Sequence, residues 1–380
     1  MSPLASRLFM RFVLAISEIS ANGPSGSRLR IARGLASRGH EVEVLSLTGR
    51  VEREIPADVN VHFLRPDLKR FPPHYPARLL LSRALRSWFR RQCDLRPIDF
   101  FSSSLTSTDR IVHMSGIDDC FYWLHIATSQ LLAEAHSPRR AARRRRFFRS
   151  LYEGKRVIGV SQGVIDDLAA LPARPEEAVV LHNSYDIEAI RRRAALEQAG
   201  IPEEPFVLHV GRFASAKRFD ILLKAFAAGT TREKLVLLTP ETPELTALIG
   251  KADLSKRVVV AGFQENPFPY MSKAAALVLS SDREGFPNVL VEALICGTPV
   301  VSTDCLAGPS EILTGPFARW LSPPGDAEAL GQNLRSVLAE PYATTELIRG
   351  SYHLSHTLDR LEELAASGRP PRLGRMKPFP

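Results

Sequence analysis

The sequence contains two successive runs in which short apolar segments alternate with segments of helical pattern. The first run opens with an apolar segment at 11–17, followed by a glycine-containing segment, a helical pattern ending at Gly39 and a second apolar segment at 41–47. The order strand, helix, strand predicts a parallel sheet covered by helices. The alternation starts again at Phe206. This restart predicts two such sheets, each in a domain of its own.

The expected elements follow this alternation. In the first run, further strands are expected at 59–64, 111–114, 121–125, 156–160 and 179–182. A helical stretch at 185–205 leads to the second run, with strands expected at 206–210, 234–238, 257–260, 275–279 and 299–302. Helices in that run are expected to begin at Arg218 and Pro287.

Length supports a division into domains, because a chain of 380 residues exceeds the size at which one hydrophobic core keeps growing. An N-terminal domain is expected at 1–195 and a second domain at 196–350. A C-terminal helix at 351–367 is expected to pack back towards the first domain. The tail at 368–380 is rich in Pro, Gly and Arg and is expected to be disordered.

Charge and cysteine content limit the partners and the compartment. The net charge of +9 favours anionic partners such as a phosphorylated substrate, an acidic membrane or nucleic acid. The four cysteines form no CxxC pair and no zinc-like cluster, which favours a reduced, cytoplasmic protein. No segment reaches the roughly 18–20 continuous apolar residues that span a bilayer. The basic and then apolar start at 1–17 is similar to a short signal peptide, but a first strand is the preferred interpretation.

The segment DREGFPNVLVEALICGTPVVSTD at 282–304 carries two carboxylates in an apolar context. A helix is expected from Pro287 to Cys296, with Gly297 suited to its C-terminal end. Glu284 lies just outside the N-terminus of this helix, where free N–H groups and the helix dipole favour a phosphate. Glu292 lies inside the helix among Val, Leu and Ala residues and is expected to be buried. It either pairs with a Lys or Arg elsewhere or accepts hydrogen bonds from neutral hydroxyls, such as a ribose diol.

Several segments together resemble a known enzyme family. EGFPNVLVEALICGTPVV at 284–301 resembles the E-x7-E signature of retaining glycosyltransferases of family 4 (group 1). HVGRFASAKRFDILLKAF, VIGVSQGVIDDL, VVLHNSYDIEAI and RGHEVEVLSL are similar to other segments of that family. The resemblance extends over most of residues 11–350. It implies the GT-B fold, an α/β architecture with two Rossmann-like doubly wound domains that face each other across a cleft.

The resemblance also implies roles for particular residues. Arg212 and Lys217 would bind the donor diphosphate and stabilise the leaving group, although a lone basic pair is otherwise usually a solvated loop. Glu284 would contact the donor sugar near the reacting carbon, and Glu292 would hold the ribose. Further donor-binding residues implied by the family are Gly285, Phe286, Pro287, Asn288, Val289 and Leu290. In the first domain, Gly26 belongs to a loop at 22–28 expected near the diphosphate, and His125 is either a contact to the donor sugar or a satisfied, half-buried histidine.

The implied reaction is hexosyl transfer with retention from a nucleotide sugar to a glycan or polyprenyl-diphosphate-linked acceptor in polysaccharide synthesis. The segments at 262–270 and 305–313 resemble members that use UDP-sugars, so UDP is the expected nucleotide. The segment at 237–245 lacks the glycine-rich turn usual in the family. No D-x-D motif stands in a suitable place. The enzyme is therefore expected to need neither a metal ion nor a cofactor.

Two arginine-rich segments suggest a membrane surface as a further partner. Segment 78–92 places leucines, Trp88 and Phe89 among arginines, and segment 139–149 contains Phe147 and Phe148 within an arginine run. Basic amphipathic helices with aromatic residues bind anionic bilayers. This reading predicts a cytoplasmic protein that associates with the inner face of the plasma membrane. The alternative is a pair of solvated arginine-rich helices.

Two other functions are alternatives to glycosyl transfer. One is another GT-B enzyme such as a UDP-sugar epimerase, which is not expected to carry the E-x7-E segment. The other is a non-catalytic basic protein that binds nucleic acid or membrane through residues 139–149. The second leaves Glu284, Glu292, Arg212 and Lys217 without an explanation, so no nucleic-acid partner is expected.

Overall fold

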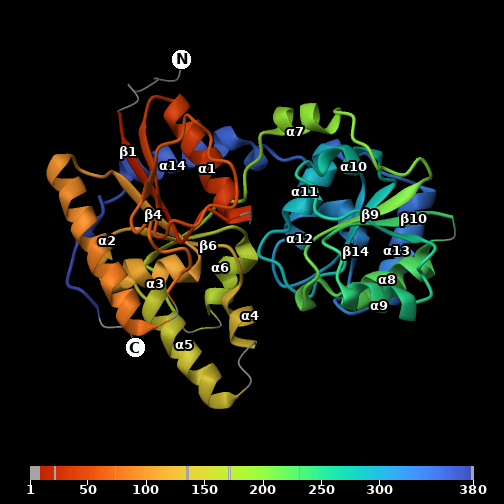
Figure 1. Ribbon diagram of the computed structural model, residues 1–380, viewed down its shortest axis with the longest axis horizontal. Coiled ribbons are helices and arrows are strands. Elements are labelled where there is room, and N and C mark those ends of the chain that lie inside the picture. The colour runs from red at the N-terminus through yellow and green to blue at the C-terminus, as the bar shows by residue number, and fades with distance from the viewer. Residues whose placement is uncertain are drawn as a thin grey trace. The chain divides into compact units, whose positions relative to one another are not determined.

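The computed structural model describes residues 9–20, 23–72, 74–133, 137–169, 171, 173–230 and 232–377. The chain divides into two compact units, shown in Figure 1. Unit 1 comprises residues 1–160, 164–184 and 354–380, and unit 2 comprises residues 161–163 and 185–353. The division therefore falls about ten residues before the expected boundary at 195, because α7 (Ile187–Ala194) packs against α10 (Phe268–Lys273) and α11 (Asn288–Ile295) of unit 2.

Unit 1 is built on a seven-stranded sheet in the order β3-β2-β1-β4-β6-β7-β8, and all neighbouring strands are parallel. All six residues of β1 are buried, as expected for a central strand with both faces covered. The strands are β1 Arg11–Ile16, β2 Glu41–Ser46, β3 Val61–Phe63, β4 Phe100–Ser104, β6 Phe121–Leu124, β7 Arg156–Gly159 and β8 Glu177–Val180. The helices between them are α1 Gly23–Ser37, α2 Tyr75–Leu95, α3 Thr106–Ser115, α4 Thr128–Ala133, α5 Pro138–Tyr152 and α6 Gln162–Ala169.

One predicted strand of unit 1 is wrong. Residues 111–114 belong to helix α3, which ends at Gly116 with a left-handed φ of 73°. The strand in this part of the chain is β4, Phe100–Ser104, whose three serines are fully buried. A short apolar run does not distinguish a helix from a strand, and serines at the end of a strand look like a loop. The first ambiguity accounts for the wrong strand at 111–114, and the second accounts for the missed strand β4.

The C-terminal segment is part of unit 1. Helix α14 (Leu354–Ser367) packs against α1, and Arg38, directly after α1, forms ion pairs with Asp359 and Glu362 on α14. Strand β15 (Arg372–Leu373) then pairs antiparallel with β5 (Ile117–Asp118), and Lys377 Nζ lies 2.7 Å from Asp118 Oδ1. Residues 368–377 are thus ordered, whereas the sequence predicts disorder for 368–380. The composition of this segment did not reveal its acidic partners on β5.

Unit 2 is built on a six-stranded parallel sheet in the order β11-β10-β9-β12-β13-β14. Its strands are β9 Phe206–Val210, β10 Lys234–Leu238, β11 Val258–Val260, β12 Ala276–Leu279, β13 Val300–Thr303 and β14 Leu321–Ser322. Its remaining helices are α8 Phe219–Gly229, α9 Pro243–Lys251, α12 Pro309–Ile312 and α13 Ala327–Ala339. Short 3-10 helices are η1 Ser215–Lys217, η2 Gly315–Trp320, η3 Thr345–Leu347 and η4 Gly350–Tyr352.

Both sheets reverse their strand order next to their first strand. β1 lies between β2 and β4, and β9 lies between β10 and β12. In open α/β sheets, ligands bind at the carboxyl ends of the strands beside such a reversal. Each unit therefore has one edge at which a site is expected. These edges are formed by the residues that follow β1, β4 and β6 in unit 1, and β9 and β12 in unit 2.

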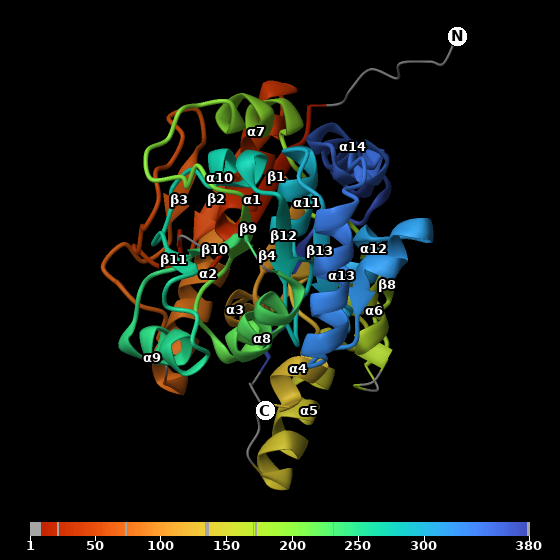
Figure 2. The same ribbon diagram turned by 90° about the vertical axis from the view of Figure 1, so that its right-hand side faces the viewer.

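Within the described ranges, no helix combines the length and apolar character needed to cross a membrane. Helix α5 extends away from the rest of unit 1, as Figures 1 and 2 show from two directions.

Candidate active site

The connection after β9 and the segment after β12 meet at the carboxyl edge of the unit 2 sheet. Lys217 Nζ lies 2.5 Å from Glu284 Oε1, and the hydroxyl of Ser281 donates to the same oxygen at 2.7 Å. The hydroxyl of Ser280 donates to the carbonyl oxygen of Lys217 at 2.7 Å. Lys217 and Glu284, both predicted to be catalytic, thus form an ion pair. Together with Ser280 and Ser281 they make a hydrogen-bonded polar cluster.

Arg218 fixes the position of this connection. It has a left-handed φ of 47°, and its guanidinium contacts Asp220 Oδ1 at 2.9 Å and Asp282 Oδ2 at 2.9 Å. Its hydrogen bonds lower the pKa of the Asp220 carboxyl below its ordinary value. Arg218 therefore ties the loop after β9 to the loop after β12, directly beside the Lys217–Glu284 pair.

Arg212 occupies a different environment from Lys217. Its side chain is exposed, and it forms no ion pair with any described residue. Lys217 is only 24% exposed and Glu284 12%. The structure therefore brings Lys217 and Glu284 together and leaves Arg212 in solvent in the same β9–α8 connection.

The segment 285–287 is held by tight packing. The carbonyl oxygen of Gly285 accepts a hydrogen bond from Ser161 Oγ at 2.7 Å, and buried Phe286 packs edge-on against Tyr352. Gly308 has a φ of 98°, and a Cβ at this position would lie 2.5 Å from Pro287 Cδ and 3.0 Å from Phe286 Cα. Only glycine fits there, so the 305–308 loop closes against the segment that carries Glu284.

Helix α11 begins at Asn288, one residue later than expected, with Pro287 as its N-cap. Leu290 is buried, Val289 is half-buried, and Asn288 Oδ1 accepts a hydrogen bond from Tyr185 Oη at 2.7 Å. Glu292 is half-buried rather than buried, because it lies off the face formed by Leu290, Val291 and Leu294. The expectation of a carboxylate enclosed in an apolar helix is therefore wrong. The first turn of α11 and Glu284 lie next to each other in sequence and at the same edge of the sheet.

His209 is a polar residue of this edge that the sequence did not single out. It is 0% exposed, its Nδ1 lies 3.0 Å from the carbonyl oxygen of Val278, and its Nε2 has no hydrogen-bond partner among the described residues. Burial lowers its pKa to about 4, so the ring is neutral at pH 7. A carbonyl oxygen only accepts, so Nδ1 carries the proton and the Nε2 lone pair faces the Gly211–Lys217 connection. A histidine at the end of an apolar strand was the only available signal.

In unit 1, the two predicted residues lie in different places. Gly26 is in the first turns of α1 rather than in a loop, because the helix begins at Gly23, and a Cβ at this position would overlap the Arg53 guanidinium. Asn22, in the expected loop at 22–28, lies outside the described residues. His125 follows β6 and is half-buried, and its Nε2 lies 3.0 Å from Arg28 Nη2. Arg28 was not predicted as a site residue.

Asp109 is a second buried acid of unit 1 that the sequence did not indicate. It is 1% exposed and accepts hydrogen bonds from Ser103 Oγ at 2.5 Å and Tyr152 Oη at 3.0 Å. Burial raises its pKa to about 7. Asp109, Tyr152 and His125 all line one small cavity of about 30 Å³.

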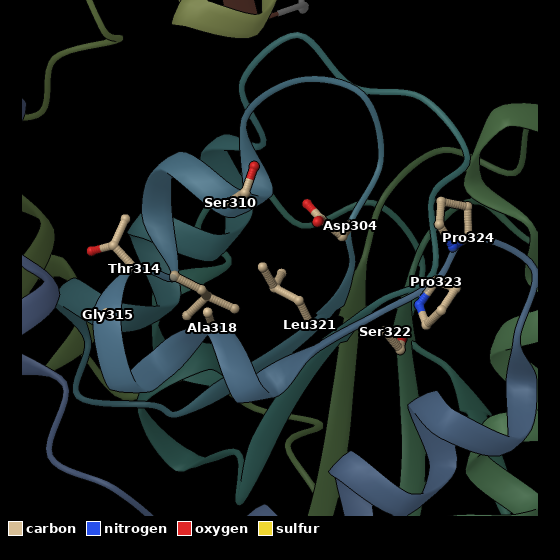
Figure 3. A pocket seen from close by; sticks show the side chains of 10 residues that line it. Asp304, Ser310, Thr314, Gly315, Ala318, Leu321, Ser322, Pro323 and Pro324 are labelled. Carbon is tan, nitrogen blue, oxygen red and sulfur yellow. The ribbon is translucent and has the colours of Figure 1, made fainter.

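A larger cavity of unit 2, of about 560 Å³, is lined by Asp304 after β13, by both residues of β14 and by residues of α12 and η2 (Figure 3). Asp304, Ser310 and Leu321 are among its lining residues, and the predicted site residues are not. The backbone N–H of Asp304 donates a hydrogen bond to the carbonyl oxygen of Ser322. The hydroxyl of Thr303 donates to the carbonyl oxygen of Ser281 in the polar cluster. The cavity is therefore a neighbour of the Lys217–Glu284 cluster and not part of it. Among the described residues, no group of three or more His, Cys, Asp or Glu side chains is arranged to hold a metal ion.

Comparison with protein-family models identifies both halves of the chain. Residues 22–189 match the model "Glycosyltransferase Family 4", and residues 204–340 match the model "Glycosyl transferases group 1". The two matches cover the sheet edges of both units. The chain belongs to glycosyltransferase family 4 (group 1).

Curated relatives of this family 4 chain include transferases named for different sugars. One is the Campylobacter jejuni N-acetylgalactosamine-N,N'-diacetylbacillosaminyl-diphospho-undecaprenol 4-alpha-N-acetylgalactosaminyltransferase, 33% identical over 48% of this chain and 51% of the relative. Another is the lipopolysaccharide 1,6-galactosyltransferase of Escherichia coli K12, 31% identical over 42% of this chain and 48% of the relative. The aligned part thus spans about half the length of these relatives.

Solved structures match the fold of the family 4 chain over nearly its whole length. Sucrose-phosphate synthase from Thermosynechococcus elongatus aligns with a TM-score of 0.75 at 18% identity, over 94% of this chain and 98% of that one. Anabaena HepE in complex with UDP-glucose aligns with a TM-score of 0.72 at 18% identity, over 94% of this chain and 99% of that one. The two parallel Rossmann-like sheets of this chain have the GT-B fold, which confirms the predicted fold class.

Proposed function

We propose that this protein is a retaining hexosyltransferase that moves a sugar from a nucleotide-sugar donor to a glycan or polyprenyl-diphosphate-linked acceptor. The observation that carries the proposal is the Lys217–Glu284 pair beside the first turn of α11, at the strand-order reversal of unit 2. A cation and helix N–H groups suit a diphosphate, and a carboxylate suits sugar hydroxyls.

In this proposal, Lys217 exchanges its contact with Glu284 for the donor phosphates when the donor binds. The ammonium group then stabilises the negative charge that develops on the leaving diphosphate. Glu284 becomes available to the sugar close to the reacting carbon. Exposed Arg212 supplies a second cation, and backbone groups of 285–290 approach the sugar and phosphates.

UDP is the proposed nucleotide. Support comes from the sequence segments at 262–270 and 305–313, and from HepE, a fold relative solved with UDP-glucose. The test is the release of nucleotide from a panel of UDP- and GDP-sugars, with and without acceptor. Turnover of a UDP-sugar is expected, and turnover of GDP-sugars alone would refute the nucleotide assignment. Retention is tested by the anomeric configuration of the transferred sugar in the product.

Metal independence is a further part of the proposal, because basic side chains and a helix dipole can carry the electrostatic work of an ion. Turnover is expected to persist in EDTA. Loss of turnover on chelation, with recovery on adding a divalent cation, would contradict it.

Glycan acceptors on a lipid carrier are proposed because the Campylobacter relative is named for a diphospho-undecaprenol acceptor. A family 4 protein working on such a carrier needs contact with a membrane surface. Helix α5 offers a cationic surface for it, the α5 arginine surface, composed of exposed Arg139, Arg140, Arg143, Arg145, Arg146 and Arg149.

Charge, rather than aromatic insertion, would carry this contact. Phe147 and Phe148 are 8% and 4% exposed, and Arg110 lies over the Phe147 ring at 4.5 Å. On α2, Leu81, Leu85, Trp88 and Phe89 are also buried. These apolar side chains are therefore not available to contact a bilayer. Each arginine near an anionic surface is worth about 1 kcal/mol.

The membrane proposal is tested by co-sedimentation with anionic and neutral vesicles. The double variant Arg143→Glu/Arg146→Glu is expected to lose most of its binding to anionic vesicles. The matched control Lys251→Glu/Lys273→Glu, on exposed lysines of unit 2, is expected to retain it. Equal binding to both vesicle types by the unmodified protein would refute the proposal.

A nucleic-acid-binding protein is the remaining alternative, and the same arginines favour it. Thermal unfolding with UDP separates the two readings, because a ligand that binds only the folded state raises the unfolding temperature. A transferase is expected to respond to UDP and a nucleic-acid binder is not.

A further inference from the structure

Arg28 is a buried cation of unit 1 with neutral partners. Its side chain is 0% exposed, its Nε–H donates to Ser104 Oγ at 2.7 Å, and its guanidinium carbon lies 3.3 Å from the centre of the Trp123 ring. Its Nη2 lies 3.0 Å from His125 Nε2, and its Nη1 has no partner among the described residues. A buried guanidinium without a carboxylate is costly, and an apolar side chain would fill the same space at lower cost.

The contact with His125 defines the chemical state of the imidazole. A guanidinium can only donate hydrogen bonds, so His125 Nε2 must present a lone pair. The proton of a neutral imidazole is then on Nδ1. Burial and the adjacent Arg28 charge both lower the pKa of His125 well below its ordinary value, so the ring stays neutral.

The location of the Arg28–His125 pair indicates what the Nδ1–H group of His125 can bind. Arg28 is on the helix after β1, Ser104 ends β4 and His125 follows β6, so all three lie at the edge where the unit 1 sheet reverses its strand order. Ligands bind at this edge in open α/β sheets. His125 is also half-buried, whereas its partner Arg28 is enclosed.

We propose that Arg28 is a positioning residue that holds His125 as the neutral, Nδ1-protonated tautomer, so that Nδ1–H donates to an oxygen atom of the bound substrate. The oxygen belongs either to the nucleotide sugar or to the acceptor, and this assignment rests on the proposed function. It follows that His125 does not exchange protons with the substrate near neutral pH.

Other ionisable groups near His125 do not change this state. The Arg30 charge acts on Arg28, whose pKa is lowered by burial and by this neighbouring cation. Asp109 and Tyr152 line the small cavity that His125 also lines, but they are hydrogen-bonded to each other, and Asp109 also accepts from Ser103. The cation in direct contact with the imidazole is Arg28.

The direct test is the nitrogen NMR spectrum of the histidine side chains in the whole, uniformly labelled protein. The signal missing in His125→Asn assigns His125. A protonated Nδ1 and an unprotonated Nε2 are expected throughout pH ~5.5–8. A protonated Nε2, or titration near the ordinary pKa of about 6.5 in the unmodified protein, would overturn the proposal.

The role of Arg28 is tested by Arg28→Met, which keeps the stem over Trp123 and removes the charge. The pKa of His125 is expected to rise in Arg28→Met but to stay below its ordinary value, because the ring remains buried, and Arg28→Lys is expected to keep it low. Arg33→Met, on an exposed arginine of the same helix, is the matched control and is expected to leave the His125 signals unchanged. An unchanged His125 pKa in folded Arg28→Met would refute the role of Arg28. If that variant does not fold, the spectrum of the unmodified protein and that of Arg28→Lys still decide.

Kinetics test the donated hydrogen bond. Asparagine at 125 places an N–H near the position of Nδ1, whereas glutamine places its amide near Nε2. His125→Gln is expected to lower kcat/KM by about tenfold, and His125→Asn by less than about threefold. Equal losses in both variants would refute donation from Nδ1.

Comparing donor hydrolysis without acceptor with transfer to acceptor shows which substrate receives the bond. A loss in both reactions assigns it to the nucleotide sugar, and a loss confined to transfer assigns it to the acceptor. If the unmodified protein releases no nucleotide from any sugar donor, the proposed function fails, whereas the NMR spectra still test the tautomer.

Discussion

Replacing Lys217 with methionine separates the structural role of its ammonium group from its proposed role in turnover. In the structure this group pairs with Glu284 at 2.5 Å, and the two side chains are 24% and 12% exposed. A partly exposed ion pair contributes about 1 kcal/mol or less. For a domain of this size, the expected fall in unfolding temperature is about 2–4 °C.

The expected effect on turnover is much larger. Removing a group that stabilises charge developing in the transition state lowers kcat by about 10²–10³-fold, equivalent to roughly 3–4 kcal/mol. Since this exceeds the loss of stability, partial unfolding at 25 °C does not account for it. Methionine keeps most of the stem volume of lysine, so packing against Gly211 is retained.

The assay is nucleotide release at saturating donor, measured together with the unfolding temperature. Lys224→Met is the matched control, because Lys224 is an exposed lysine on α8, and it is expected to leave both quantities unchanged. A Lys217→Met enzyme with kcat within about threefold of the unmodified enzyme would refute the reasoning. Lys217 would then be a structural partner of Glu284 and not a leaving-group contact.

Three further predictions concern single residues. Glu292→Ala is expected to reduce the UDP-induced rise in unfolding temperature and to raise KM for the donor, with kcat little changed; an undiminished UDP response would contradict the ribose role. Asp109→Asn is expected to stabilise the protein above pH ~7 in denaturant titrations. Burial raises the pKa of Asp109 to about 7, so the folded state binds more protons than the unfolded state between pH ~4 and ~7, and stability falls as pH rises through that window. A variant with an unchanged pH dependence of stability would show that Asp109 does not cause it. Gly308→Ala is expected to cost about 1–3 kcal/mol and to lower turnover, because a side chain at φ 98° is strained and would press on Pro287 and Phe286; calorimetry on both proteins measures it, and an unchanged unfolding temperature would contradict it.

The sequence predicted the sheets of the fold well where strands are continuous apolar runs. β1, β2, β9, β10, β12 and β13 begin and end within one residue or so of their expected positions. The prediction failed at β4, because two of its serines form hydrogen bonds with polar groups inside the protein: Ser103 with Asp109 and Ser104 with Arg28. A strand that uses buried hydroxyls for hydrogen bonding has no apolar signature.

In the candidate site, too, some residues could be predicted from the sequence and others could not. Glu284, Lys217 and the start of α11 were predictable because they stand in a continuous motif around a turn and a helix. Arg28 and His209 were not, because their partners come from other strands: Ser104 and His125 for the first, Val278 for the second. The partners of an isolated polar residue in an apolar segment can be identified only when the order of the strands in the sheet is known.

Helix α5 shows what a helical pattern alone leaves undecided. Phe147 and Phe148 stand within an arginine run, and the sequence suggested that aromatic and basic side chains share one membrane-facing surface. In the structure the two phenylalanines turn inward, with Phe148 stacked on Tyr152 at 6.3 Å between ring centres, and the arginines turn outward. The same residues therefore predict a different kind of contact.

A surface of arginines without inserted rings binds an anionic membrane through charge. Screening at high salt is expected to remove such binding, since the Debye length falls from about 10 Å at 0.1 M to about 3 Å at 1 M. Vesicle binding that persists at 1 M salt would show instead that apolar groups carry the contact, and the outward-facing arginines of α5 would then not explain it.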